Sequence, residues 1–173
     1  MARLLSSSKI MYKITSAVVA LALFLSIGTA FAKGPMNKAT GSIWMSDPSQ
    51  SVSFNAFDAG ANSASDRGSV TYANYTYAAA TPEGYLTYTV PVMCATVAGD
   101  DARFMYQIPA GFPGLTGLYV LAAVHNGGTS GVEGDTYGHT ATGDLATAMS
   151  WCESGVGVSN YPITAGNLQV HTY

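Results

Sequence analysis

Short strand-forming segments, separated by Gly, Pro, Asn and Asp, recur along the chain from residue 42 onward. They constrain the fold most, because no apolar i, i+3, i+4, i+7 pattern of an amphipathic helix persists there over about eleven residues. Residues 103–108 alternate cleanly and place Phe104, Tyr106 and Ile108 on one face. Residues 118–125 are apolar on both faces, which predicts a central strand. The expected strands are 42–46, 52–57, 69–77, 85–90, 92–97, 103–108, 118–125, 146–152 and 168–173.

This pattern predicts an all-β fold. About eight or nine short strands with turn-rich links are typical of an antiparallel β-sandwich, immunoglobulin-like or jelly-roll-like, and a barrel is the alternative. A parallel α/β architecture needs crossover helices, and the sequence indicates none. The last strand is expected to pair near the first. Residues 126–144 are expected to form the longest loop, and loops of that length are often functional.

The first 32 residues have the pattern of a secretory signal peptide. Three basic residues precede an apolar run that begins at residue 17, and Ala30-Phe31-Ala32 fits the small-x-small cleavage rule. The run is short for a bilayer span, which needs about 20 residues, so cleavage after Ala32 is favoured over an uncleaved anchor. Met11 is an alternative start. We therefore expect a secreted, extracellular protein.

The rest of the chain is expected to form a short N-terminal lead at 33–40 and a single domain at 41–173, since domains usually hold about 100–200 residues. After cleavage, four basic residues remain against ten carboxylates, a net charge near −6. Such a chain has no large basic face, so nucleic acid is not an expected partner. It also has no second apolar run long enough to span a membrane.

Two cysteines, Cys94 and Cys152, remain in the exported part of the chain. An oxidising compartment and an even count favour a disulfide between them. The bridge would close a loop of about 58 residues, which the chain-entropy model values at about 4 kcal/mol. Two buried free thiols are the alternative. A metal site is not expected, because Cys-x-x-Cys spacing is absent.

The loop at 126–135, NGGTSGVEGD, is a candidate calcium site. Glycines let its backbone turn sharply, and Asn126, Glu133 and Asp135 supply the oxygen ligands that calcium prefers. The alternative is a glycine-rich hairpin connection with polar tips and no metal. No other cofactor is expected.

Catalytic signatures are absent from the sequence, and no catalytic residue is assigned. It contains no G-x-S-x-G, no H-E-x-x-H and no phosphate-binding G-x-x-x-x-G-K. The neighbours Asp100 and Asp101, and the pair Glu133 and Asp135, have the residue types of a glycosidase's two carboxylates. Acidic residues in turns are usually solvated, so this interpretation is not favoured.

Five tyrosines cluster in two consecutive expected strands: Tyr72, Tyr75, Tyr77, Tyr85 and Tyr88. Flat aromatic rings bind sugars by stacking, so the cluster is a candidate glycan-binding face. The alternative is structural, because tyrosine also suits a half-buried pleated surface.

Four stretches resemble an uncharacterised group of small secreted β-rich domains from bacteria. They are GSIWMSDPSQSVSFNAFD at 41–58, GSVTYANYTY at 68–77, VHNGGTSGVEGD at 124–135 and GNLQVH at 166–171. The resemblance spans nearly the whole exported chain. It implies export and a β-rich fold, and it transfers no catalytic residue, because no activity is associated with the group.

The sequence therefore favours an exported, non-catalytic β-sandwich module with a structural or interaction role. A carbohydrate-binding module that uses an aromatic strand face is one alternative, and a secreted hydrolase is another. The partner is not specified by the residues, and an extracellular glycan or a cell-surface component is the kind that fits.

Overall fold

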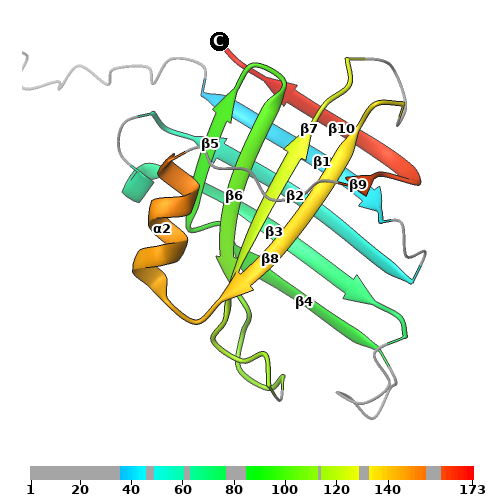
Figure 1. Ribbon diagram of the computed structural model, residues 1–173, viewed down its shortest axis with the longest axis vertical. Coiled ribbons are helices and arrows are strands. Elements are labelled where there is room, and N and C mark those ends of the chain that lie inside the picture. The colour runs from blue at the N-terminus through cyan, green and yellow to red at the C-terminus, as the bar shows by residue number, and fades with distance from the viewer. Residues whose placement is uncertain are drawn as a thin grey trace, which may run out of the picture. The chain divides into compact units, whose positions relative to one another are not determined.

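The computed structural model describes residues 36–45, 49–60, 63–76, 85–112, 114–128, 133–154 and 161–173. These residues form ten strands in two antiparallel sheets of five strands each, one α-helix and one short 3-10 helix (Figure 1). The predicted all-β sandwich is confirmed. The sheets do not close into the barrel that was the alternative.

The first sheet has the strand order β10-β1-β2-β3-β4. The predicted pairing of the last strand with the first is confirmed, with Lys38 opposite His171 and Trp44 opposite Ala165. The last four residues of the expected lead, 37–40, belong to β1, and 38–40 pair on both sides. The strand bounds are β1 (Asn37–Trp44), β2 (Gln50–Asp58), β3 (Arg67–Asn74), β4 (Leu86–Pro91) and β10 (Ala165–His171).

The second sheet has the order β5-β6-β7-β8-β9, with β7 at its centre as predicted. The expectation of one long loop at 126–144 is wrong, because β8 occupies the middle of that stretch. Tyr137 of β8 lies opposite Val124 of β7. The next residue of β8, Gly138, has no side chain and interrupts the apolar alternation that would reveal the strand. The strand bounds are β5 (Cys94–Ala98), β6 (Asp101–Gln107), β7 (Tyr119–His125), β8 (Thr136–Thr142) and β9 (Tyr161–Pro162).

The main core lies between the two sheets. Phe104 and Tyr106 of β6, and Ile108 just after it, face this core as the alternation predicted, and all three are buried. Phe54 of β2 stacks on Phe104 with ring centroids 4.7 Å apart, which joins the two layers at their centre. The other large buried side chains are mostly aliphatic and include Ile43, Val52, Val70 and Val124.

The strand expected at 146–152 is wrong, because these residues belong to the helix α2 (Leu145–Ser154). Asp144 caps its first turn by accepting hydrogen bonds from the backbone N–H and the hydroxyl of Thr147. These bonds hold the pKa of the Asp144 carboxyl below its usual value. The helix packs on the outer face of the second sheet, where Met105 and Leu121 form a second apolar cluster beneath it (Figure 1). That cluster explains why the central strand is apolar on both faces.

The predicted disulfide between Cys94 and Cys152 is confirmed, with their Cα atoms 6.4 Å apart. It joins β5 to α2, so it fastens the helix to the sheet it covers. The 3-10 helix η1 (Ser63–Ser65) lies in the connection between β2 and β3. The proposed signal peptide lies outside the described residues. Within the described part of the chain, no helix is long and apolar enough to cross a membrane.

Candidate functional site

The predicted tyrosine cluster divides between the interior and the surface. Tyr72 and Tyr88 pair across β3 and β4 and point toward the core, with ring centroids 5.5 Å apart. Tyr88 is only 8% exposed, and burial raises its pKa to about 12. These two rings therefore contribute to packing. Tyr75 and Tyr85 lie at the surface, and Tyr77 lies outside the described residues.

Tyr75 and Tyr85 join Trp44 in a row of three exposed rings, which we call the aromatic strip. Trp44 is the last residue of β1, Tyr75 follows β3 and Tyr85 precedes β4. The rings are 39%, 54% and 41% exposed, respectively. The ring centroids of Trp44 and Tyr75 are 5.9 Å apart, those of Tyr75 and Tyr85 are 6.4 Å apart, and successive planes differ by 26° and 33°. The Trp44 and Tyr75 rings are stacked on each other, the Tyr75 and Tyr85 rings are tilted, and part of each ring stays exposed.

Trp44 was missed as a site residue, although the sequence contains a signal for it. Ile43 is 1% exposed and faces the core. Since neighbouring residues in a strand point to opposite faces, Trp44 must point outward. A large aromatic residue on the solvent side of a strand is the observation that would have placed it with the two exposed tyrosines.

The strip borders an uncharged, hydroxyl-rich surface on the outer side of the first sheet, which we call the hydroxyl face. Its central row crosses all five strands in register, and its side chains are exposed. Two hydrogen bonds link hydroxyls along this row, from Ser42 to Ser53 (2.9 Å) and from Thr71 to Thr89 (2.8 Å). The central row is Asn167, Ser42, Ser53, Thr71 and Thr89, and the flanking rows are Gln169, Thr40, Asn55, Ser69, Pro91 and Ala165, Trp44, Ser51, Ala73, Thr87.

None of the residues in these three rows is ionisable. Among the described residues of this face, Lys38 and Arg67 lie in the next row, at the end away from the aromatic strip, where they flank Phe57. The guanidinium of Arg67 lies over the Phe57 ring, 5.7 Å from its centroid. The surface beside the strip therefore offers hydroxyl and amide groups without charge.

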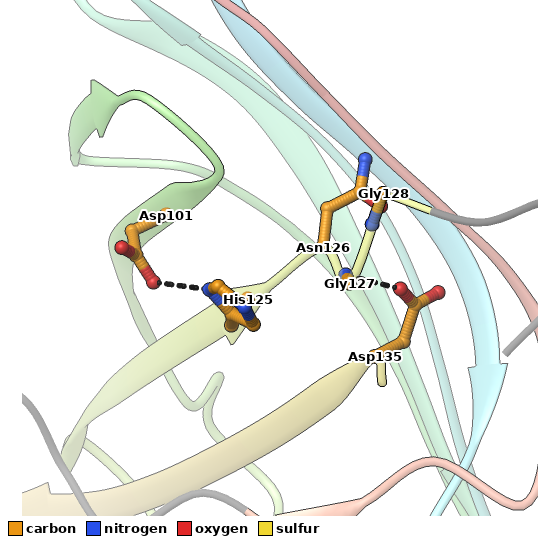
Figure 2. Close-up of polar contacts among 6 residues, drawn as sticks. All are labelled: Asp101, His125, Asn126, Gly127, Gly128 and Asp135. Atoms are coloured by element: carbon orange, nitrogen blue, oxygen red, sulfur yellow. Dashed lines mark hydrogen bonds and ion pairs between the residues drawn. The ribbon is translucent and has the colours of Figure 1, made fainter. Parts of the chain in front are cut away.

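The candidate calcium ligands lie at one end of the second sheet (Figure 2). Asp135 is 1% exposed, and one of its carboxylate oxygens accepts the backbone N–H of Gly127 at 2.8 Å. The side-chain oxygen of Asn126 accepts the N–H of Gly128, and Glu133 is exposed. Through these hydrogen bonds, Asn126 and Asp135 stabilise the two ends of the loop. The second carboxylate oxygen of Asp135 is buried and has no hydrogen-bond partner.

One of the acidic residues considered for catalysis also has a structural partner. Asp101, one of the considered catalytic acids, contacts Nδ1 of His125 at 2.9 Å across β6 and β7 (Figure 2). Among the residues that the structure describes, no group of three or more His, Cys, Asp or Glu side chains is placed to hold a metal ion.

Two further aspartates fasten the edge of the second sheet to the first. Asp58 accepts the backbone N–H groups of Gly60 and Val97, and Asp66 accepts those of Ala59 and Ala95. Burial raises the pKa of Asp66, and these backbone hydrogen bonds oppose that shift. These two aspartates, already engaged with the β5 edge, line a hollow of about 400 Å³ together with Glu153, which accepts a hydrogen bond from the Ser63 hydroxyl.

Comparison with protein-family models, with curated proteins and with solved structures finds no match to the chain. The chemistry of its surfaces and cavities therefore carries the functional inference.

Proposed function

We propose that the protein is an exported, non-catalytic interaction module that binds a neutral glycan through the aromatic strip and the hydroxyl face. The observation that carries this proposal is the junction of the two surfaces at Trp44 on the outer side of the first sheet. Aromatic rings stack on the C–H faces of sugars, while hydroxyl and amide groups exchange hydrogen bonds with sugar hydroxyls.

The charge distribution selects the class of glycan. The three rows nearest the strip contain no ionisable side chain, so they offer no partner to a carboxylate or sulfate on an acidic polysaccharide. Moving a charged group from water onto such a surface without a counter-charge is unfavourable. A neutral polymer loses less on binding, because each of its hydroxyls can be paired again.

A binding role fits the acidic residues better than catalysis does. Asp58 and Asp66 each accept two backbone hydrogen bonds, and Asp101 contacts His125. These carboxylates are therefore engaged in contacts that stabilise the fold. The pattern of the first 32 residues and the Cys94–Cys152 disulfide both support export, since disulfides persist in oxidising compartments.

Affinity electrophoresis and calorimetry on a panel of neutral and acidic polysaccharides test the proposal. We expect retention by at least one neutral glycan, and a loss of about tenfold or more in affinity for Trp44→Ala and for Tyr75→Ala. The matched control is Tyr173→Ala, because Tyr173 is 69% exposed and lies outside the strip. Parallel runs with calcium and with a chelator test whether the loop at 126–135 contributes.

Failure to bind any neutral glycan would overturn the proposal, as would binding that the two strip variants leave unchanged. Turnover of a bound glycan, abolished by Asp101→Asn, would support the hydrolase alternative.

A further inference from the structure

The end of the hydroxyl face away from the aromatic strip is formed by a row that combines basic and aromatic side chains. Lys38 of β1 lies opposite His171 of β10 on one side and Phe57 of β2 on the other. Phe57 in turn lies opposite Arg67 of β3. Each of these residues is two positions from a member of the neighbouring hydroxyl row, so all four side chains point to the outer side of the sheet. We call these four residues the cationic row.

The two permanent cations of this row have no carboxylate partner among the described residues. No ion pair joins Lys38 or Arg67 to a carboxylate in that part of the chain. Asp58 follows Phe57 and Asp66 precedes Arg67, but both carboxylates accept backbone N–H groups of β5 instead. The fold therefore turns the neighbouring negative charge toward the second sheet. The cationic row keeps a positive charge that an external anion can neutralise.

The geometry of the row lets both cations reach one group. The guanidinium of Arg67 lies over the Phe57 ring, 5.7 Å from its centroid, and so lies on the side of β3 that faces Lys38. One guanidinium nitrogen contacts Sδ of Met36 at 3.2 Å, and a guanidinium has five N–H donors, so donors remain for a ligand. Adjacent strands lie about 4.8 Å apart, which separates the backbones of Lys38 and Arg67 by about 10 Å. Two such long side chains can hold one oxyanion between them above Phe57, Arg67 with two parallel hydrogen bonds.

The position of the row indicates what carries the anion. Lys38 and Trp44 lie six residues apart on β1, which corresponds to about 20 Å at about 3.4 Å per residue. The surface between them is the uncharged hydroxyl face. We propose that the ligand is a glycan whose neutral units occupy the strip and the hydroxyl face, and that the cationic row holds a single carboxylate or phosphate about 20 Å from the unit stacked on Trp44. This inference rests on the proposed function and adds to it the anionic group and its distance.

Calorimetry with matched pairs of oligosaccharides tests the inference. Each pair consists of a neutral oligosaccharide that the protein retains and the same oligosaccharide with one carboxylate, placed at the reducing or at the non-reducing end. At low salt we expect one charged form to bind about three- to tenfold more tightly than its neutral partner, but only when the chain is long enough to span about 20 Å. The gain should disappear at about 1 M salt, where charges are screened beyond about 3 Å. Equal affinity of the charged and neutral forms would overturn the anionic group and leave the neutral-glycan proposal intact, whereas no binding of either form would overturn both.

Three charge variants show whether the gain arises at the cationic row. Lys38→Gln and Arg67→Gln should each remove most of the gain and leave the affinity for the neutral form unchanged, because neither side chain is buried. Arg103→Gln is the matched control, since it removes the same charge from β6 of the second sheet and should keep the gain. Trp44→Ala should weaken the charged and the neutral form alike. A gain that persists in both Lys38→Gln and Arg67→Gln, or that Arg103→Gln removes equally, would contradict the assignment to this row.

Discussion

The two sheets of the sandwich differ in what lies on their outer faces. The second sheet presents Met105 and Leu121 on its outer side, and α2 with its disulfide covers them. The first sheet presents serine, threonine and asparagine, and these side chains are exposed. Apolar residues on an outer face require a cover, whereas hydroxyl-bearing residues do not. The contrast indicates that the first sheet keeps its outer face open for contact with water or a ligand.

Removing the disulfide should produce the largest change in stability. Replacing both Cys94 and Cys152 with alanine releases α2 from β5, and the loop closed by the bridge spans 58 residues. We expect the free energy of unfolding to fall by about 2–5 kcal/mol, measured by denaturant titration. Amide exchange should accelerate in α2 before it does in β2. Equal acceleration of amide exchange in both sheets would contradict the proposed difference between them.

The cluster beneath the helix should be nearly as sensitive. Leu121→Ala removes a buried side chain from the contact between β7 and α2, and we expect a loss of about 3 kcal/mol. Thr89→Ala on the hydroxyl face is the matched control in the first sheet. Its side chain is exposed, so its effect should stay within about 0.5 kcal/mol. Equal losses of unfolding free energy from the two substitutions would show that the outer faces of the two sheets contribute to stability in the same way.

His139 should add a smaller, pH-dependent contribution at the edge of the second sheet. Its pKa in the folded protein lies below the ordinary value of 6.5, so the unfolded chain takes up the proton first. The contribution to stability is therefore complete above pH 6.5 and is lost as the pH falls through the folded pKa. His139→Gln should flatten this part of the pH profile in thermal melts. An unchanged slope in His139→Gln would assign the effect to other groups.

The sequence was sufficient for the features that depend on simple alternation. Phe104, Tyr106 and Ile108 face the core, β7 is central, and the last strand pairs with the first. Cys94 and Cys152 form the predicted bridge, although Cys152 lies in a helix rather than a strand. Export and the role of the loop at 126–135 stay predictions.

The helix was missed because its ten residues are too few to show a sustained amphipathic pattern. Asp144 is a standard N-cap residue, and the alanines that follow favour helix, so the local signal was present. The stronger signal was tertiary: residues 118–125 are apolar on both faces, and a strand of a two-layer sandwich needs only one apolar face. A third layer on the second sheet was the physical requirement behind that pattern.

The candidate site was only partly predictable, because the tyrosines of this region divide between the inner face of β3 and β4 and the residues just beyond the strand ends. Tyr72 and Tyr88 fall on the inner face, and Tyr75 and Tyr85 lie beyond the strand ends on the outer side. Trp44 reaches them from β1, about thirty residues earlier in the chain, through pairing that no local pattern specifies. The same limit applies to the hydroxyl rows, since their alignment depends on the register of five strands.

The central claim is that the outer face of the first sheet is the binding surface, and chemical-shift mapping with a neutral oligosaccharide tests it most directly. We expect the perturbed amides and rings to lie at Trp44, Tyr75 and Tyr85 and to extend onto Ser53 and Thr71, while α2 and β7 stay unchanged. Perturbations centred on α2 or on the loop at 126–135, with none on the first sheet, would contradict it.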